Sequence, residues 1–241
     1  MTIARRTFLK NVVTGSSLIA GAVPLGLAAE RDRGSSGGVS SAPIVFLRTR
    51  TSLDDVFRHG MAAATDRNGR CRVSTRLLDP LEQTDPVFLG RLLVGLKGRR
   101  LVGLMEDAPY ALFEATARTL GARSLFIGQH SWGGGRTDHS SHRLVTVPQC
   151  RGVSSVLAGA LRVGDQGYSI SETSLGSMRT PESADPLVIT NSGHWAAVAG
   201  EMLATICRGR WQPAPAGRFQ RARGKHEYGN SGSVVSFVID A

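Results

Sequence analysis

The segment GQHSWGGGRTDHSSH, which ends at His142, holds the densest group of side chains that could do chemistry. His139 and His142 carry imidazoles that could bind Zn or another divalent ion, with Asp138 as a nearby carboxylate. His130 is a candidate catalytic base in the same segment. The spacing His139-x-x-His142 matches no metalloenzyme signature, however. A polar loop that merely contains histidines, or a glycine-rich lid, is the competing interpretation.

A second group of candidates follows the predicted strands. Glu106 could act as a general base or a metal ligand, and Asp107 and Gln129 could contact a bound ligand. Asp107 also stands at the start of a predicted helix, where a carboxylate stabilises the helix dipole. We therefore favour helix capping over chemistry for Asp107.

The run Asn191-Ser192-Gly193-His194 lies between a predicted strand and a predicted helix. Its backbone amides could hold a carboxylate or a phosphate, with Ser192 and His194 assisting and His194 as a further candidate catalytic residue. A serine nucleophile would need the Gly-x-Ser-x-Gly turn, and this run is not that turn. Helix capping by Asn191 or Ser192 is the favoured alternative.

The run RTRTS follows the first predicted strand. Arg48 and Arg50 there could hold an anion beside a helix N-terminus. The run lacks the glycine spacing of dinucleotide and P-loop fingerprints, so capping and solvated charge are favoured. No cofactor is identified by the sequence, and a bound flavin would require a fingerprint that we do not find.

These candidates must be positioned by elements that alternate along the chain. β-rich runs predict strands at 43–49, 71–78, 100–106, 122–130, 142–147, 168–174 and 186–190. Amphipathic windows predict helices at 52–64, 84–98, 108–121, 152–164 and 191–206. In the second helix, Asp85 is the predicted cap, Pro86 the first turn and Gly98 the stop.

This alternation predicts a three-layer α/β/α domain over residues 42–241, Rossmann-like or flavodoxin-like, with a mostly parallel sheet. The last residues predict a C-terminal β-hairpin or two edge strands. Two half-domains divided across residues 131–141 are the alternative. In open α/β sheets, ligands bind beyond the carboxyl ends of the strands, which is where the candidates above fall.

The first residues form a leader with a basic start, a weakly apolar middle and a small-residue cleavage site at Ala28-Ala29. Arg5-Arg6-Thr7-Phe8-Leu9-Lys10 resembles the twin-arginine signal, with Ala4 where that pattern has Ser or Thr. The resemblance covers residues 4–29 only. It implies the twin-arginine export machinery as a partner, a periplasmic or otherwise exported location in a bacterial envelope, and a cargo that folds before it crosses. Residues 30–41 are rich in Gly and Ser and predict a flexible linker.

Composition narrows the classes of partner. The net charge is +10, but the basic residues do not alternate with aromatic ones as a groove for nucleic acid requires. We therefore do not predict a nucleic-acid partner. The leader is too weakly apolar to predict a stable transmembrane segment. Cys71, Cys150 and Cys207 allow one disulfide with one thiol left over, but buried thiols are favoured.

Two functions from different classes remain open. The first is a non-catalytic exported protein that binds a small molecule or serves an envelope partner protein. The second is a hydrolase assisted by a metal or a histidine base, using the segment 129–142.

The leader generates the first testable prediction. Replacing Arg5 and Arg6 by Lys should trap a longer precursor in the cytoplasm, because the export pathway requires the arginine pair. Immunoblotting of cytoplasmic and envelope fractions measures this. Mature protein outside the cytoplasm in the double variant would contradict the assignment.

Overall fold

A computed structural model describes residues 42–68, 73–133, 139–161, 167–174, 182–187, 194–209, 211 and 232–241. The leader with Arg5 and Arg6, the linker, Cys71 and the run 191–193 lie outside the described residues. The chain from Ser40 to Ala241 forms one compact unit. None of the described helices is both long and apolar enough to cross a lipid bilayer.

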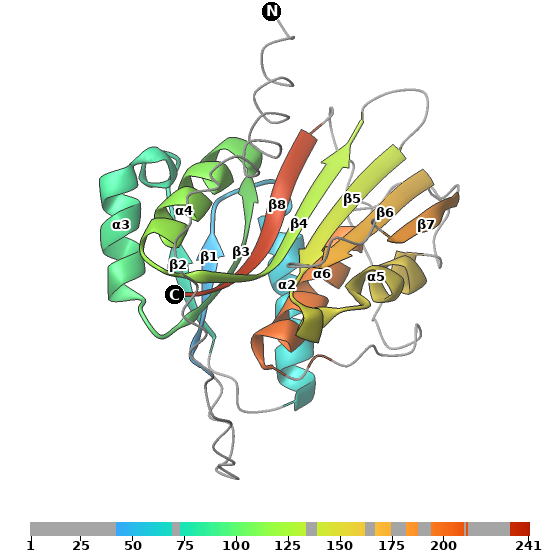
Figure 1. Ribbon diagram of the computed structural model, residues 1–241, viewed down its shortest axis with the longest axis horizontal. Coiled ribbons are helices and arrows are strands. Elements are labelled where there is room, and N and C mark those ends of the chain that lie inside the picture. The colour runs from blue at the N-terminus through green and yellow to red at the C-terminus, as the bar shows by residue number, and fades with distance from the viewer. Residues whose placement is uncertain are drawn as a thin grey trace, which may run out of the picture. The chain divides into compact units, whose positions relative to one another are not determined.

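The described strands form one eight-stranded sheet in the order β2-β1-β3-β8-β4-β5-β6-β7 (Figure 1). Their bounds are β1 Ile44–Arg48, β2 Val73–Leu77, β3 Arg100–Glu106, β4 Arg123–Trp132, β5 His139–Thr146, β6 Gly167–Ser174, β7 Glu182–Leu187 and β8 Gly232–Asp240. β1 pairs in parallel with β2 and β3, and β5 with β6. The other four pairings are antiparallel. The α/β class is confirmed, but the prediction of a mostly parallel sheet is wrong, because the sheet is mixed.

β8 explains much of this difference. It pairs antiparallel with β3 along one edge and with β4 along the other. The expected C-terminal hairpin or edge strand is therefore also wrong, because both edges of β8 are occupied by strands from earlier in the chain. Residues 234–239 of β8 are all buried, as expected for a central strand covered on both faces.

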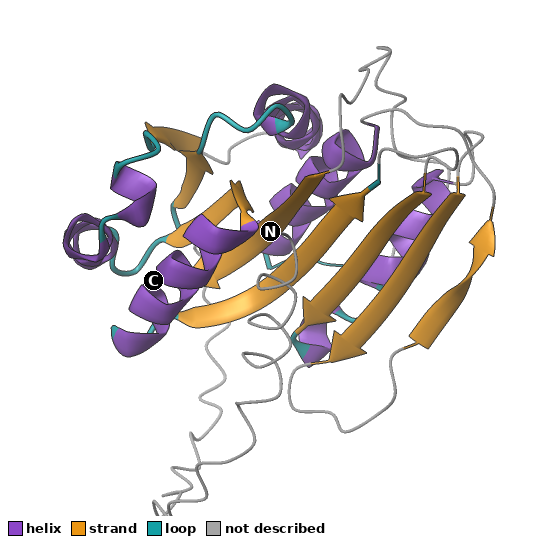
Figure 2. Ribbon diagram, turned by 90° about the horizontal axis from the view of Figure 1, so that it is seen from above, coloured by secondary structure: helices purple, strands orange, loops and turns teal. Residues whose placement is uncertain are grey.

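Within the described residues, five α-helices lie on the two faces of the sheet (Figure 2). Their bounds are α2 Asp54–Asn68, α3 Pro86–Gly95, α4 Asp107–Thr119, α5 Val153–Leu161 and α6 His194–Cys207, with short 3-10 helices η2 Glu82–Thr84 and η3 Pro148–Cys150. α2, α5 and α6 pack with one face of the sheet, and α3 and α4 pack with the other. The predicted start of α3 is confirmed: the Asp85 side chain accepts hydrogen bonds from the amides of Val87 and Phe88.

Side chains alternate along β1 between the two cores. Ile44 and Phe46 pack toward α2 and α6, whereas Val45 and Leu47 pack toward α3 and α4. Four of the five β1 residues are therefore buried on one face or the other, which is why the run contains no polar alternation.

α2 and α6 approach each other closely through two glycines. A Cβ added to Gly60 would lie 1.9 Å from the carbonyl oxygen of Ala197, and one added to Gly200 would lie 2.1 Å from that of Phe57. Real Cβ atoms do not come this close to backbone atoms. The absence of a side chain at both positions is therefore required for the helix contact.

This contact yields a stability prediction. Gly200→Ala should lower the free energy of unfolding by about 1–3 kcal/mol, because the methyl group must push two helix backbones apart. Gly95→Ala in α3 is the matched control, since nothing lies within 4 Å of its added Cβ. The control should be neutral or gain up to about 1 kcal/mol from helix propensity. Urea unfolding measures both, and equal stability of the two variants would contradict the packing account.

Candidate functional site

The carboxyl ends of β1 and β3 form the point where the chain changes from one face of the sheet to the other. The two strands are parallel neighbours, yet β1 leads into α2 on one face and β3 leads into α4 on the opposite face. Such a divergence opens the edge of the sheet between the two loops, and ligands of open α/β sheets bind there.

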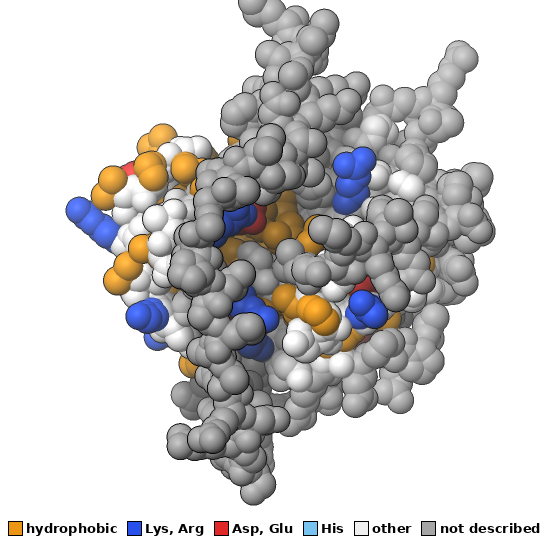
Figure 3. Space-filling model, in the orientation of Figure 1, with side chains coloured by type: hydrophobic (Ala, Val, Ile, Leu, Met, Phe, Trp, Pro, Cys, Tyr) orange, Lys and Arg blue, Asp and Glu red, His pale blue; other side chains and the backbone are white. Residues whose placement is uncertain are grey.

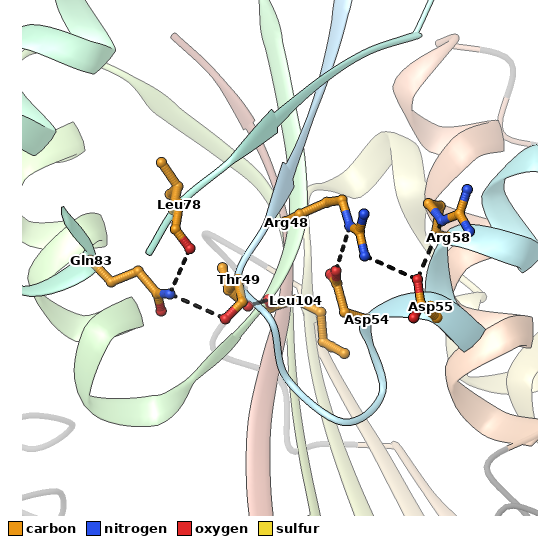
Figure 4. Close-up of polar contacts among 8 residues, drawn as sticks. All are labelled: Arg48, Thr49, Asp54, Asp55, Arg58, Leu78, Gln83 and Leu104. Atoms are coloured by element: carbon orange, nitrogen blue, oxygen red, sulfur yellow. Dashed lines mark hydrogen bonds and ion pairs between the residues drawn. The ribbon is translucent and has the colours of Figure 1, made fainter. Parts of the chain in front are cut away.

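Hydrogen bonds join the ends of three strands at this edge (Figure 4). The Thr49 hydroxyl, just after β1, donates to the carbonyl of Leu104 in β3. Gln83 Nε2 donates to the carbonyls of Thr49 and Leu78, each at 3.2 Å. Gln83 is buried, so its amide satisfies two carbonyls that water does not reach. The loop after β1 is therefore held in place from both sides.

The switch-point site, as we call Arg48, Arg50, Thr51 and Asp54, is built on this loop. Arg50 has φ of 59° and is the one described non-glycine residue with a positive φ. An arginine in the left-handed region is strained, and such strain concentrates at functional sites. Arg48 Nε donates to Asp54 Oδ2 at 2.8 Å, and its Nη2 donates to Asp55 Oδ1 at 3.0 Å.

Two buried polar atoms of this site lack a hydrogen-bond partner among the described residues: Thr51 Oγ1 and Asp54 Oδ1. The Asp54 side chain is only 2% exposed. Burial raises the pKa of the Asp54 carboxyl. The ion pair with Arg48 and the nearby Thr49 amide act in the opposite direction, because they favour the charged carboxylate. That amide does not hydrogen-bond Oδ1. Leaving a buried acceptor unsatisfied costs about 1–3 kcal/mol, a cost that a bound donor would remove.

A second polar group, the buried histidine pair, lies on the same face as α6. His130 in β4 and His142 in β5 are directly opposite each other, and each is 1% exposed. Their Nδ1 atoms lie 2.8 Å apart. His130 Nε2 lies 2.7 Å from Ser236 Oγ, and His142 Nε2 lies 3.1 Å from Ser140 Oγ. The four side chains form one continuous chain of hydrogen bonds.

Two residues make room for this pair and cover it. A Cβ on Gly128 would lie 2.8 Å from Ser236 Oγ and 2.9 Å from His130 Nε2, so a larger residue would block that hydrogen bond. The Trp195 ring from α6 stacks on His130, with ring centroids 4.3 Å apart and planes at 26°. The imidazole is thus enclosed by aromatic and backbone atoms rather than by solvent.

The geometry of the pair is that of a hydrogen bond and not of a shared metal. Two nitrogens bound to one tetrahedral Zn at about 2.0–2.1 Å would lie about 3.3 Å apart, further than the 2.8 Å separation of the Nδ1 atoms. In the hydrogen bond between the two Nδ1 atoms, one ring must donate and the other must accept. The Ser236 hydroxyl then either donates to His130 Nε2 or accepts from it, depending on which ring donates. Burial and the neighbouring His142 hold the pKa of His130 well below its ordinary value.

The remaining candidates from the sequence are dispersed. Glu106 in β3 and His130 in β4 pair with the same residue of β8, Val234, which therefore lies between them. Glu106 is exposed. The Ser233 hydroxyl donates to Asp107 Oδ2 on the opposite face. Gln129 is exposed on β4.

Other predicted positions differ from expectation or are not described. His130 and His142 stand in paired strands and not in one loop. His139 begins β5 and His194 begins α6, but their side chains lie outside the described set, as do Asn191, Ser192 and Gly193. In the described part of the chain, no group of three or more His, Cys, Asp or Glu could hold a metal ion.

Sequence reasoning missed Asp54, Ser236 and Glu172. Asp54 adjoins the RTRTS run, and its place beside the capping residues could have indicated a role. Nothing in the local sequence connects Ser236 to a histidine, because their contact spans half the chain. Glu172 in β6 is structural: it accepts hydrogen bonds from Thr146 and from the amides of Gly152 and Ser154 at the start of α5.

Comparison with protein-family models, with curated proteins and with solved structures finds no match for this chain. The function must therefore be argued from the chemistry of the two polar groups.

The histidine pair predicts how stability depends on pH. An unfolded histidine takes up a proton near pH 6.5, whereas folded His130 resists it. The unfolded state therefore binds more protons than the folded state as the pH falls below about 6.5. Because of His130 alone, the free energy of unfolding should fall by up to about 1.4 kcal/mol per pH unit. Urea unfolding from pH 7 to 5 measures the slope.

Two variants separate this effect from other titrations. His130→Gln should flatten the slope, whatever its absolute stability. His59→Gln, at an exposed position of α2, should leave the slope unchanged. Identical slopes for the natural protein and His130→Gln would show that the buried imidazole is not the cause.

Proposed function

We propose that this is a non-catalytic protein of the bacterial cell envelope that binds a small polar ligand at the switch-point site. The observation that carries the proposal is the buried Asp54 Oδ1, which lacks a hydrogen-bond partner among the described residues, as does Thr51 Oγ1 three positions earlier in the chain. Unsatisfied buried polar atoms are rare in folded proteins. Of the four such atoms among the described residues, Tyr110 Oη and Arg208 Nε lie elsewhere, and the other two follow β1, at the edge of the sheet where ligands of this fold class bind.

The arrangement of β2, β1 and β3 supports a Rossmann-like or flavodoxin-like assignment for the first half of the domain. The strand order β2-β1-β3 is parallel, and the connecting helices lie on opposite faces. Both fold types bind their ligands where the strand order reverses. We place the site on this half for that reason.

The site chemistry defines the class of ligand. Asp54 Oδ1 can only accept while ionised, so its partner must be a hydrogen-bond donor such as a hydroxyl, an ammonium or an amide N–H. Thr51 Oγ1 can either donate or accept. The neighbouring Arg50 is exposed, and its charge would favour an anionic group on the same ligand. A small hydroxy or amino acid, or a sugar acid, combines these features.

The absence of an accessible nucleophile and base supports binding over catalysis in the described residues. The switch-point site contains hydroxyls and a carboxylate already paired to Arg48. Two serines are hydrogen-bonded to histidines in the described residues: Ser236, which is fully buried, and Ser140, whose contact with the buried His142 is only partly buried.

Export remains part of the proposal. The twin-arginine resemblance of residues 4–10 supports an envelope location and delivery by the twin-arginine machinery.

A hydrolase is the second candidate, favoured by one observation. Ser236 Oγ, His130 and His142 are linked in the order nucleophile, base and orienting group. Catalysis would require an opening that exposes Ser236. Covalent labelling by a fluorophosphonate probe, lost in Ser236→Ala, would support it; failure of the probe to label the folded protein would sink it.

Ligand binding is tested with Asp54→Asn. Hydroxy acids, amino acids and sugar acids are screened by thermal shift, and any binder is then measured by calorimetry. We expect at least one to bind, and Asp54→Asn to weaken it by about tenfold or more, because a hydrogen bond to a charged group is lost.

Asp55→Asn is the matched control. Asp55 also pairs with Arg48, but its side chain is 74% exposed, so this variant should keep its affinity. The proposal fails if no compound of these classes binds, or if both variants bind as the natural protein does.

A further inference from the structure

The exposed large apolar side chains of the described residues gather at one end of the sheet. They lie on β2, on α3 and the turn before it, and just after α4: Leu77, Leu81, Val87, Val94 and Leu120. Leu81 is 81% exposed, and Val87 and Val94 are 60% and 63% exposed. In the space-filling view, hydrophobic side chains mark the outer edge on the side of α3 (Figure 3). Exposed apolar side chains that gather on one part of a surface are typical of interaction sites.

α3 has apolar residues on its outer side as well as its inner side. Leu89 and Leu93 pack into the core, while Val87 and Val94 point outward two turns apart. Gly90 lies between them, and nothing is within 4 Å of an added Cβ there. Arg91 is the single charged residue of the helix. A solvated surface helix is normally polar on this side.

A groove adjoins the outer side of α3. It has a volume of about 290 Å³ and is lined by Pro86, Gly90, Ala115, Thr116, Thr119 and Leu120. Its walls are small or apolar, so it could accept a valine or leucine side chain from another molecule. The exposed side chains of Val87 and Val94 on the same helix are apolar like the groove walls.

The charges at the two ends of α3 are also complementary to each other. Asp79, Glu82 and Asp85 lie before its first residue, where Glu82 also pairs with Arg76 and Asp85 caps the helix, whereas Lys97 and Arg99 lie just beyond its last. A second α3 placed antiparallel to the first would bring each acidic end against a basic end. This is the self-complementarity that a two-fold interface requires.

We propose that a second copy of this chain docks on this surface, forming a homodimer through antiparallel α3 helices with the two-fold axis near Gly90. The helix is about 15 Å long, so Leu81 and Leu120 must contribute to approach the area of about 1,200 Å² that a stable interface buries. The interface lies on the face of the sheet opposite the α2–α6 layer and does not depend on the proposed ligand site.

The test is the mass of the full-length chain in solution, by light scattering and sedimentation from about 1 to 100 µM. We expect a concentration-dependent dimer. The double variant Val87→Glu, Val94→Glu should raise the dimer dissociation constant by more than about tenfold, because four carboxylates would face an apolar interface. Ala62→Glu, at an exposed position of α2 on the other face, should leave the dimer intact.

Gly90→Arg provides a second variant in case the double variant misfolds. Nothing lies within 4 Å of a Cβ added at this position in the single chain, but the arginine would separate the two helices at the axis. It should therefore also yield monomer with an unchanged circular dichroism spectrum. A chain that is monomeric throughout the concentration range overturns the proposal, whether or not the surface binds a lipid or another protein. A dimer that survives both α3 variants overturns it as well.

Discussion

The pairing of β8 with β3 and β4 is the interaction on which the rest of the structure depends. β8 hydrogen-bonds to both neighbours along almost its full length and joins a parallel half, β2-β1-β3, to a largely antiparallel half, β4 to β7. Arg100 anchors its end, donating to Asp240 and to the carbonyl of Cys207 in α6. Phe237 then packs between Tyr110 and Phe113 of α4. Without β8 the two halves would share no backbone hydrogen bonds among the described strands.

The histidine pair takes its geometry directly from this strand, whereas the switch-point site is tied to the neighbouring strand β3. Ser236 of β8 holds His130, and Ser233 of β8 holds Asp107 at the end of β3. The switch-point site lies one strand further on, where Thr49 is tied to β3 through Leu104. The two groups differ in whether a buried polar atom lacks a hydrogen-bond partner. The histidine chain is internally satisfied and fits a structural role, because each ring nitrogen has a partner. Asp54 is buried but not fully satisfied, which is why we propose that a ligand binds there.

Local signals in the sequence predicted local structure well. The Asp85–Pro86 start of α3 and the strands and helices of the first half needed only capping rules and hydrophobic periodicity. The position of β8 in the sheet could not be predicted, because a run such as VVSFVID has the same hydrophobic pattern in a central strand as in a buried edge strand. The mixed sheet follows from that position, so it was missed too. For the site, the histidines drew attention, but glycines between them favoured a loop, and their pairing depends on a register that local sequence does not encode. Asp54 was not identified as a candidate, because an acidic residue at the start of a helix ordinarily caps that helix.

The central claim is that β8 completes one cooperative sheet. Native-state hydrogen exchange tests it most directly, because it reports the opening free energy of each amide. The account predicts that amides of residues 234–239 exchange only through global unfolding, in the slowest class and together with those of β3 and β4. Exchange of β8 amides at a lower free energy than those of β1 and β3 would show that the C-terminal strand detaches on its own, and would contradict the account.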